Sequence, residues 1–120
     1  MKNYIDVSTI AISQPGEKIT ISTHDNDISS ICDTLQCNQI EIIRLSRGIF
    51  IWIDKHALRD HKENNKSATK VTSSLLLEEG RIINDTGEIF GTVIFSAKDA
   101  EGNMKSLDNE QITYLKAFSS

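Results

Sequence analysis

The sequence predicts a single α+β domain over residues 1–120, with a predominantly antiparallel sheet and helices packed on one side. Two pairs of short apolar runs are each joined by a tight-turn sequence, a pattern typical of hairpins and so of antiparallel strands. Three other segments repeat their apolar residues at helical spacing. A chain of 120 residues is also long enough to bury one core without disulfides or metals. The predicted order of elements is ββαββαβα.

The first pair of strands lies in DVSTIAISQPGEKITIST. Apolar residues at 7–12 and at 19–21 lie on either side of Pro15-Gly16, which favours a tight turn. We therefore expect a hairpin near the start of the chain.

The first helix is predicted after this hairpin. Its apolar residues recur at helical spacing from Ile28 to Leu35, and one of the polar residues at 25–27 can act as the N-cap. The helix is expected to end at about Cys37, with Asn38 just beyond it.

The strongest strand pattern is IEIIRLSRGIFIWID, in which β-branched and aromatic runs lie on either side of Ser46-Arg47-Gly48. This pattern predicts a second hairpin. Its second arm, 49–53, is apolar at every position. Such a run indicates a central strand that is covered on both faces, or a strand at an oligomer contact.

Three further elements complete the predicted order. A second helix begins with Ser67 as N-cap and ends at Gly80. The run GEIFGTVIFSA, 87–97, is a strand in which Gly91 marks a bulge or a close backbone approach. The last helix follows a cap at 108–109.

Composition favours a cytoplasmic protein. Cys32 and Cys37 are spaced as neither a zinc pair nor a redox CxxC pair, and we expect both to be reduced. No N-terminal run resembles a signal peptide, and no stretch approaches the roughly 20 apolar residues that span a bilayer, so no membrane partner is expected. The net charge of −4 argues against binding to duplex nucleic acid, which depends on many Lys and Arg contacts.

No catalytic, metal or cofactor site is predicted. The histidines at 24, 56 and 61 are the obvious candidates for acid–base chemistry, but none lies in a catalytic spacing. The sequence contains no nucleophile elbow, HExxH, P-loop or dinucleotide fingerprint. His56 and His61 with a nearby aspartate could ligate a metal, yet polar loops supply such combinations by chance.

A locally basic segment, HALRDHKENNKSATK, is the main candidate for a binding site. Residues 55–70 contain five basic side chains against two acidic ones, in a protein that is acidic overall. The segment ends where the second helix begins, and a helix N-terminus offers free N–H groups and positive potential to an anion. A phosphate or a nucleotide is the ligand class that this arrangement suits. The residues predicted to bind it are Arg59, Lys62, Asn65, Lys66 and Thr69, with Trp52 as a stacking face and Arg47 near the rim.

The alternative is that this segment is a solvated loop that ends in a helix cap. Loops of more than about 12 residues are often either functional or disordered. The two interpretations therefore fit the same composition and differ in whether the segment is ordered. An aromatic residue in an apolar strand, as Trp52 is, also belongs more often to a core than to a ligand site.

Part of the chain resembles a small domain family of unknown function that is common in phages and mobile elements. The resemblance rests on IEIIRLSRGIFIWIDKHAL, Asn64 or Asn65, SAT and GEIFGTVIF, and it covers roughly residues 40–95. It implies a phage-type domain, which would act in the cytoplasm of the host cell. It assigns no reaction.

Three function classes follow. The first is a non-enzymatic counter-defence protein that binds and sequesters a small phosphorylated, nucleotide-like signal. The second is a protein–protein inhibitor of a host defence complex, which would act by surface occlusion through acidic patches such as LLLEE and DAEG. The third is a nucleotide-processing enzyme, whose turnover would depend on His56 or His61.

We also expect a homodimer, because small binding proteins often build their pocket between subunits. The contact surfaces would be the apolar strand at 49–53 and the last helix, through Tyr114, Leu115 and Phe118. The alternative is that these residues fill one core.

Overall fold

The strand pairs in the described part of the chain are all antiparallel, and they form one sheet with the strand order β2-β1-β5-β4-β3. The computed structural model describes residues 7–81 and 88–118. The strands are β1 (Val7–Ser13), β2 (Thr20–Asp25), β3 (Ile40–Arg44), β4 (Phe50–Asp54), β5 (Val93–Lys98) and the short β6 (Met104–Lys105), which pairs with β5. The helices are α1 (Ile28–Leu35), α2 (Lys66–Leu77) and α3 (Asn109–Lys116). The α+β class and the order ββαββαβα are confirmed, with β6 as a short addition before α3.

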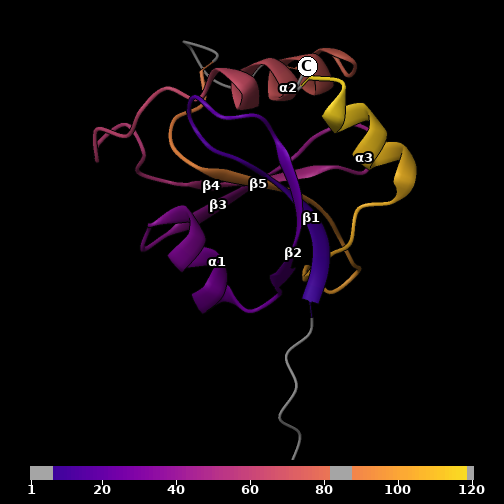
Figure 1. Ribbon diagram of the computed structural model, residues 1–120, viewed down its shortest axis with the longest axis horizontal. Helices are drawn as coiled ribbons and strands as arrows, with labels where there is room; N and C mark the ends of the chain where they lie inside the picture. Colours follow the sequence, from indigo (N-terminus) through magenta and orange to yellow (C-terminus); the bar gives the residue numbers. More distant parts are fainter. Residues whose placement is uncertain (1–6, 82–87, 119–120) are drawn as a thin grey trace, which may run out of the picture.

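The helices cover both faces of the sheet (Figure 1). Alternate strand residues point to opposite sides, so Ile51 and Phe95 pack with α2 and α3, whereas Trp52 and Ile94 pack with α1. The sequence predicted helices on one side only, and the position of α1 corrects this. The physical reason is that β4 and β5 bury successive residues, so each face of the sheet needs a cover that excludes water.

β4 is a central strand covered on both faces, which is one of the two interpretations of the apolar run 49–53. It lies between β5 and β3, and Ile51 and Trp52 are 0% and 1% exposed. In α3, Leu115 is buried as well, and the rings of Tyr114 and Phe118 pack against each other and against the same core. These side chains therefore serve to fill one core, as the alternative expected. The homodimer itself stays a prediction.

The helix boundaries differ slightly from those predicted. α2 begins with Asn65 as its N-cap, two residues before Ser67, because the Asn65 side chain accepts a hydrogen bond from the N–H of Ala68. α1 ends at Leu35, since Gln36 adopts a left-handed conformation with φ of 52°.

Gly91 marks a close approach, as the sequence predicted. β5 begins at Val93, later than the predicted strand, whose first residue, Gly87, lies outside the described residues. Gly91 has φ of 81°, and a Cβ at this position would lie 2.9 Å from Cδ of Lys62. Glycine is therefore required here both by the backbone conformation and by the neighbouring lysine.

The buried side chain of Asn65 joins three parts of the chain. Its Oδ1 accepts hydrogen bonds from the N–H of Ala68 (3.0 Å) and from the hydroxyl of Ser13 (3.2 Å). Its Nδ2 donates to the carbonyl oxygens of Ser13 and Gly91, both at 2.9 Å. The residue is 0% exposed, so these bonds replace hydrogen bonds to water. The end of β1, the start of α2 and the approach to β5 are thus fixed to one amide.

We expect Asn65→Ala to lower the free energy of unfolding by roughly 3 kcal/mol, because it removes the N-cap and leaves two buried carbonyl oxygens without their donor. Asn65→Asp keeps the acceptor but not the donor, so it should destabilise the protein too. Urea unfolding followed by circular dichroism measures both variants. The exposed Asn38→Ala is the control and should change stability by less than about 0.5 kcal/mol. Equal stability of Asn65→Ala and the control would contradict this role.

Candidate functional site

Lys62, predicted to bind the ligand, is held within the protein. Its Nζ donates hydrogen bonds to the carbonyl oxygens of Leu35 and Gln36, each at 2.7 Å, and lies 3.0 Å from Oδ2 of Asp54. These carbonyls are at the C-terminal end of α1, where the helix dipole favours a cation. The Lys62 side chain is only 17% exposed. Lys62 therefore caps α1 from the segment that precedes α2.

Asp54 is the buried anion that balances Lys62. Its side chain is 2% exposed, and its Oδ1 accepts a hydrogen bond from the N–H of His56 at 2.9 Å. Burial on its own would raise the pKa of Asp54, but the N–H of His56 and the ammonium of Lys62 outweigh burial and hold this pKa below its usual value. Removal of either charge would leave the other buried without its partner.

Three other predicted binding residues have structural contacts in the interior. Asn65 is the buried junction described above. The Oγ1 of Thr69 donates to the carbonyl of Asn65 at 2.9 Å and accepts from the N–H of Ile89 at 2.8 Å. The Nε1 of Trp52 donates to Oγ of Ser96 at 2.7 Å within the core. The buried Trp52 ring presents no face on which a base could stack, which corrects the predicted stacking role.

The two predicted arginines contact different parts of the molecule. Arg47, with φ of 62°, pairs with Glu78 at 3.0 Å and lies 4.3 Å from the ring centre of Tyr114. Arg59 is exposed, and its Nε lies 3.4 Å from Oδ1 of Asp60. Arg47 and Arg59 therefore do not converge on one ligand site.

Of the seven predicted residues, Lys66 alone lines the hollow at the first turn of α2. Lys70, one turn further along the helix, and Lys18, after the turn between β1 and β2, line it with Lys66. The backbone N–H groups of Lys66 and Ser67 have no hydrogen-bond acceptor within 7–81 and 88–118. We call this hollow the basic groove; it has a volume of about 610 Å³ and is lined by Gly16, Glu17, Lys18, Glu63, Asn64, Lys66, Ser67, Lys70 and Phe118.

No pattern in the sequence indicates that Lys18 belongs to this groove. Lys18 lies far from Lys66 in the chain, and it follows a turn whose composition suggested only a hairpin. Lys70 is one of the five basic residues of 55–70, but it is not among the residues predicted to bind the ligand. Only the packing of the β1–β2 turn near α2 brings the three lysines to one hollow.

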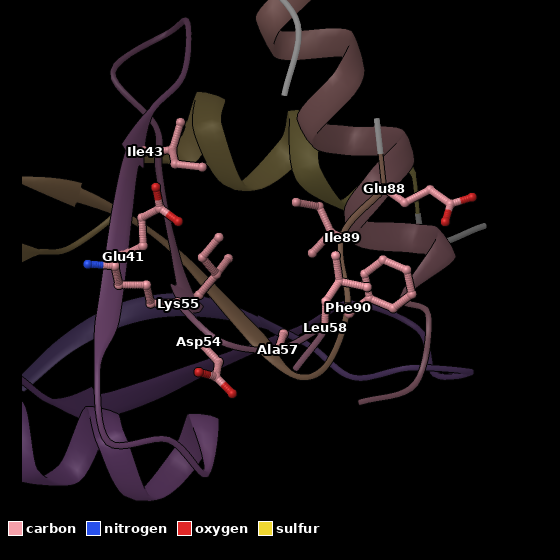
Figure 2. A pocket seen from close by; sticks show the side chains of 10 residues that line it. Glu41, Ile43, Asp54, Lys55, Ala57, Leu58, Glu88, Ile89 and Phe90 are labelled. Carbon is pink, nitrogen blue, oxygen red and sulfur yellow. The ribbon is translucent and has the colours of Figure 1, made fainter. Parts of the chain in front are cut away.

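A second hollow lies between β3, β4 and the segments 55–58 and 88–90 (Figure 2). We call it the sheet pocket; its volume is about 230 Å³. Its residues come from three separate parts of the chain, so no local pattern in the sequence indicated it. It is lined by Glu41, Ile43, Ile53, Asp54, Lys55, Ala57, Leu58, Glu88, Ile89 and Phe90.

Cys32 and Cys37 lie together at the end of α1. The N–H of Cys37 donates to the carbonyl of Cys32 at 3.1 Å, and both residues are free cysteines. Burial, followed by the neighbouring Cys32 and Asp54, raises the pKa of Cys37 to about 11. Cys37 is therefore protonated at neutral pH and is a poor nucleophile. In the part of the chain that the structure describes, no three His, Cys, Asp or Glu side chains are grouped to hold a metal ion.

The fold and these sites define an α+β domain with an antiparallel sheet, whose described residues form a basic groove and a more apolar sheet pocket among their surface hollows. The model of a family described as a domain of unknown function (DUF3846) matches residues 8–119, so the chain belongs to that family. No curated protein and no solved structure matches the chain. The expected membership of a family of unknown function is confirmed, over more of the chain than 40–95, whereas the phage or mobile-element origin stays a prediction. None of the helices in the described ranges has the length and apolar character needed to cross a membrane.

We expect Lys62→Met to lower the free energy of unfolding at neutral pH by about 3–5 kcal/mol, because it leaves Asp54 buried without its partner. A low folded-state pKa stabilises the protein above the pH at which the unfolded carboxyl titrates, and this contribution is lost as the pH falls through the folded-state pKa. The difference between variant and wild type should therefore shrink in acid. Urea unfolding over a pH series measures it, with the exposed Lys55→Met as control. A difference that does not change with pH would contradict the pairing.

We expect Cys37 to react with iodoacetamide on the order of a hundredfold more slowly at pH 8 in the folded protein than in urea, because a pKa of about 11 leaves little thiolate. Peptide mapping by mass spectrometry follows the alkylation of Cys37. In Cys32→Ser the rate in the folded protein should rise, since one cause of the raised pKa is removed. Similar rates in folded and unfolded protein would rule this out.

Proposed function

We propose that the protein is a non-enzymatic binding protein that sequesters a small phosphorylated ligand in the basic groove. The observation that carries this proposal is that Lys18, Lys66 and Lys70 line one hollow at the first turn of α2, from two segments that are distant in the chain. Lysine ammonium groups bind phosphate oxygens as mobile point charges and need no fixed geometry.

The start of α2 adds donors to these charges. The N–H groups of Lys66 and Ser67 are free of acceptors within the described residues, and the helix of 12 residues places its positive end at the groove. The hydroxyl of Ser67 lies on the same lining. A phosphate in the groove would therefore meet both ammonium groups and backbone donors.

Two carboxylates restrict the kind of anion that fits. Glu17 and Glu63 also line the groove and would repel a long polyanion. A ligand with one or two phosphates and an uncharged remainder suits this mixture better than a nucleic-acid strand does. The half-buried ring of Phe118 at the same lining offers an apolar contact for that remainder.

The nucleotide-like nature of the ligand rests on the basic residues and the helix N-terminus at the start of α2, and the counter-defence role rests on the resemblance to phage-type domains. On this proposal the protein acts in the host cytoplasm by lowering the free concentration of a signal, and it needs no turnover. His56 and His61, on which an enzyme was expected to depend, line neither the basic groove nor the sheet pocket.

Of the two acidic patches named for a protein–protein inhibitor, LLLEE and DAEG, the first is partly neutralised by the chain itself. Glu78 lies 3.0 Å from Arg47, and Glu79 lies 3.4 Å from Arg44 and 3.1 Å from Arg81. These exposed pairs reduce the negative potential of LLLEE. This alternative therefore ranks below the phosphate-binding proposal.

We expect inorganic pyrophosphate and ADP to bind the wild-type protein and adenosine not to bind, as measured by isothermal titration calorimetry. Lys18→Ala and Lys66→Ala should each weaken binding about tenfold, or roughly 1.4 kcal/mol, because each removes one charge from the groove. Binding should also weaken with added salt, since the attraction is between charges that are open to solvent.

Lys105→Ala is the matched control, because it removes the same charge from an exposed residue of β6, outside the groove. Its affinity should equal that of the wild type. If neither pyrophosphate nor ADP binds the wild type, or if Lys18→Ala binds as well as Lys105→Ala, the proposal is overturned.

A further inference from the structure

The sheet pocket has an apolar floor and an apolar wall. Ile43 of β3 and Ile53 of β4 lie on the sheet face that packs with α2 and α3, and both are only partly buried. Ala57 and Leu58 also line the pocket, and Figure 2 shows Leu58 next to Phe90 and Ile89 across from Ile43. Leu58 is 62% exposed, and together with the partly buried Ile43 and Ile53 it forms one continuous apolar lining. The pocket therefore exposes apolar surface that a ligand could cover.

Glu41 brings one negative charge to this apolar surface. It pairs in register with Ile53, so its side chain lies on the same face of the sheet as the pocket floor. Figure 2 shows its carboxylate turned toward Ile43 rather than away from the pocket. Among the residues that the structure describes, this carboxylate has no hydrogen-bond or ion-pair partner.

The other charged residues around the pocket do not neutralise Glu41. Asp54 is paired with Lys62, and Glu88 accepts a hydrogen bond from Nδ2 of Asn64 at 3.1 Å. The amino group of Lys55 points away from the pocket in Figure 2. Lys55 therefore adds an exposed positive charge at the rim, whereas the carboxylate of Glu41 is the charge turned toward the apolar lining.

We infer that the sheet pocket binds a small organic cation, a primary ammonium group on a compact apolar body. The apolar body would cover Ile43, Ile53 and Leu58, and the ammonium group would pair with the carboxylate of Glu41. A pocket of about 230 Å³ has room for one ring, because protein cavities of roughly 150 Å³ hold benzene. The size favours a small molecule over a peptide segment.

The sheet pocket and the basic groove are distinct sites with a shared wall. Asn64 lines the groove, Phe90 lines the pocket, and the two residues form a β-bridge with each other. A ligand in the pocket does not need the groove to be occupied. Failure of phosphate binding would consequently leave this inference standing, and the reverse also holds.

We expect benzylammonium to bind in the sheet pocket, as measured by ¹H–¹⁵N NMR titration of the wild-type protein at neutral pH. Saturable shifts should appear at the amides of Ile43, Ile53 and Leu58. Benzyl alcohol, which has the same ring and no charge, should bind at least fivefold more weakly, and benzoate should not bind. This order of affinities is the result expected from an apolar pocket with one carboxylate.

Two variants separate the contributions of charge and apolar surface. Glu41→Gln should weaken benzylammonium at least fivefold and leave benzyl alcohol unchanged, whereas Leu58→Ser should weaken both. Both residues are exposed, so the fold should be kept, and unchanged NMR spectra outside the pocket verify this. Glu101→Gln, an exposed carboxylate outside the pocket, is the matched control. The inference is overturned if benzylammonium causes no saturable shifts, or if Glu41→Gln binds it as tightly as the wild type does. It is also overturned if benzoate binds more tightly than benzylammonium.

Discussion

The hydrogen bonds of the buried Asn65 amide set the positions of the segments that surround both hollows. β1 ends at this amide through Ser13, α2 begins at it through Ala68, and Gly91 is held by it before β5 starts. Because one planar group satisfies partners in all three segments, these segments cannot shift independently. The first turn of α2, with Lys66 at the basic groove, is therefore positioned from the interior rather than by the side chains of the groove.

The pair formed by Asp54 and Lys62 extends this control to the other face of the sheet. Lys62 precedes α2 in the chain, yet its ammonium group binds the carbonyls at the end of α1, such as that of Leu35. The segment 55–65 thus connects a helix on one face with a helix on the other. Two of its polar residues, Lys62 and Asn65, turn inward to bind backbone carbonyls, whereas most of its other charged residues are exposed.

Local patterns identified the hairpins, the buried strand β4 and the cap of α3, because each depends on neighbouring residues; Asp108 and Gln111 form a capping box within one turn. The residues of the candidate site were harder to predict, because a sequence does not distinguish a lysine that binds a backbone carbonyl from a lysine that binds phosphate. Lys62 has the first role, and Lys66 is free for the second. The approach of Lys18 to α2 depends on tertiary packing, so it could not be predicted.

The contact between Gly91 and Lys62 has a consequence for the evolution of the family. The lysine stem lies so close that a Cβ at position 91 would be 2.9 Å from its Cδ, and the φ of 81° adds a second constraint. A side chain at position 91 would force the stem of Lys62 to move, and this would disturb the cap of α1 and the partner of Asp54. Substitutions at positions 54, 62 and 91 should therefore be inherited together, so that these three columns of a family alignment co-vary as a unit.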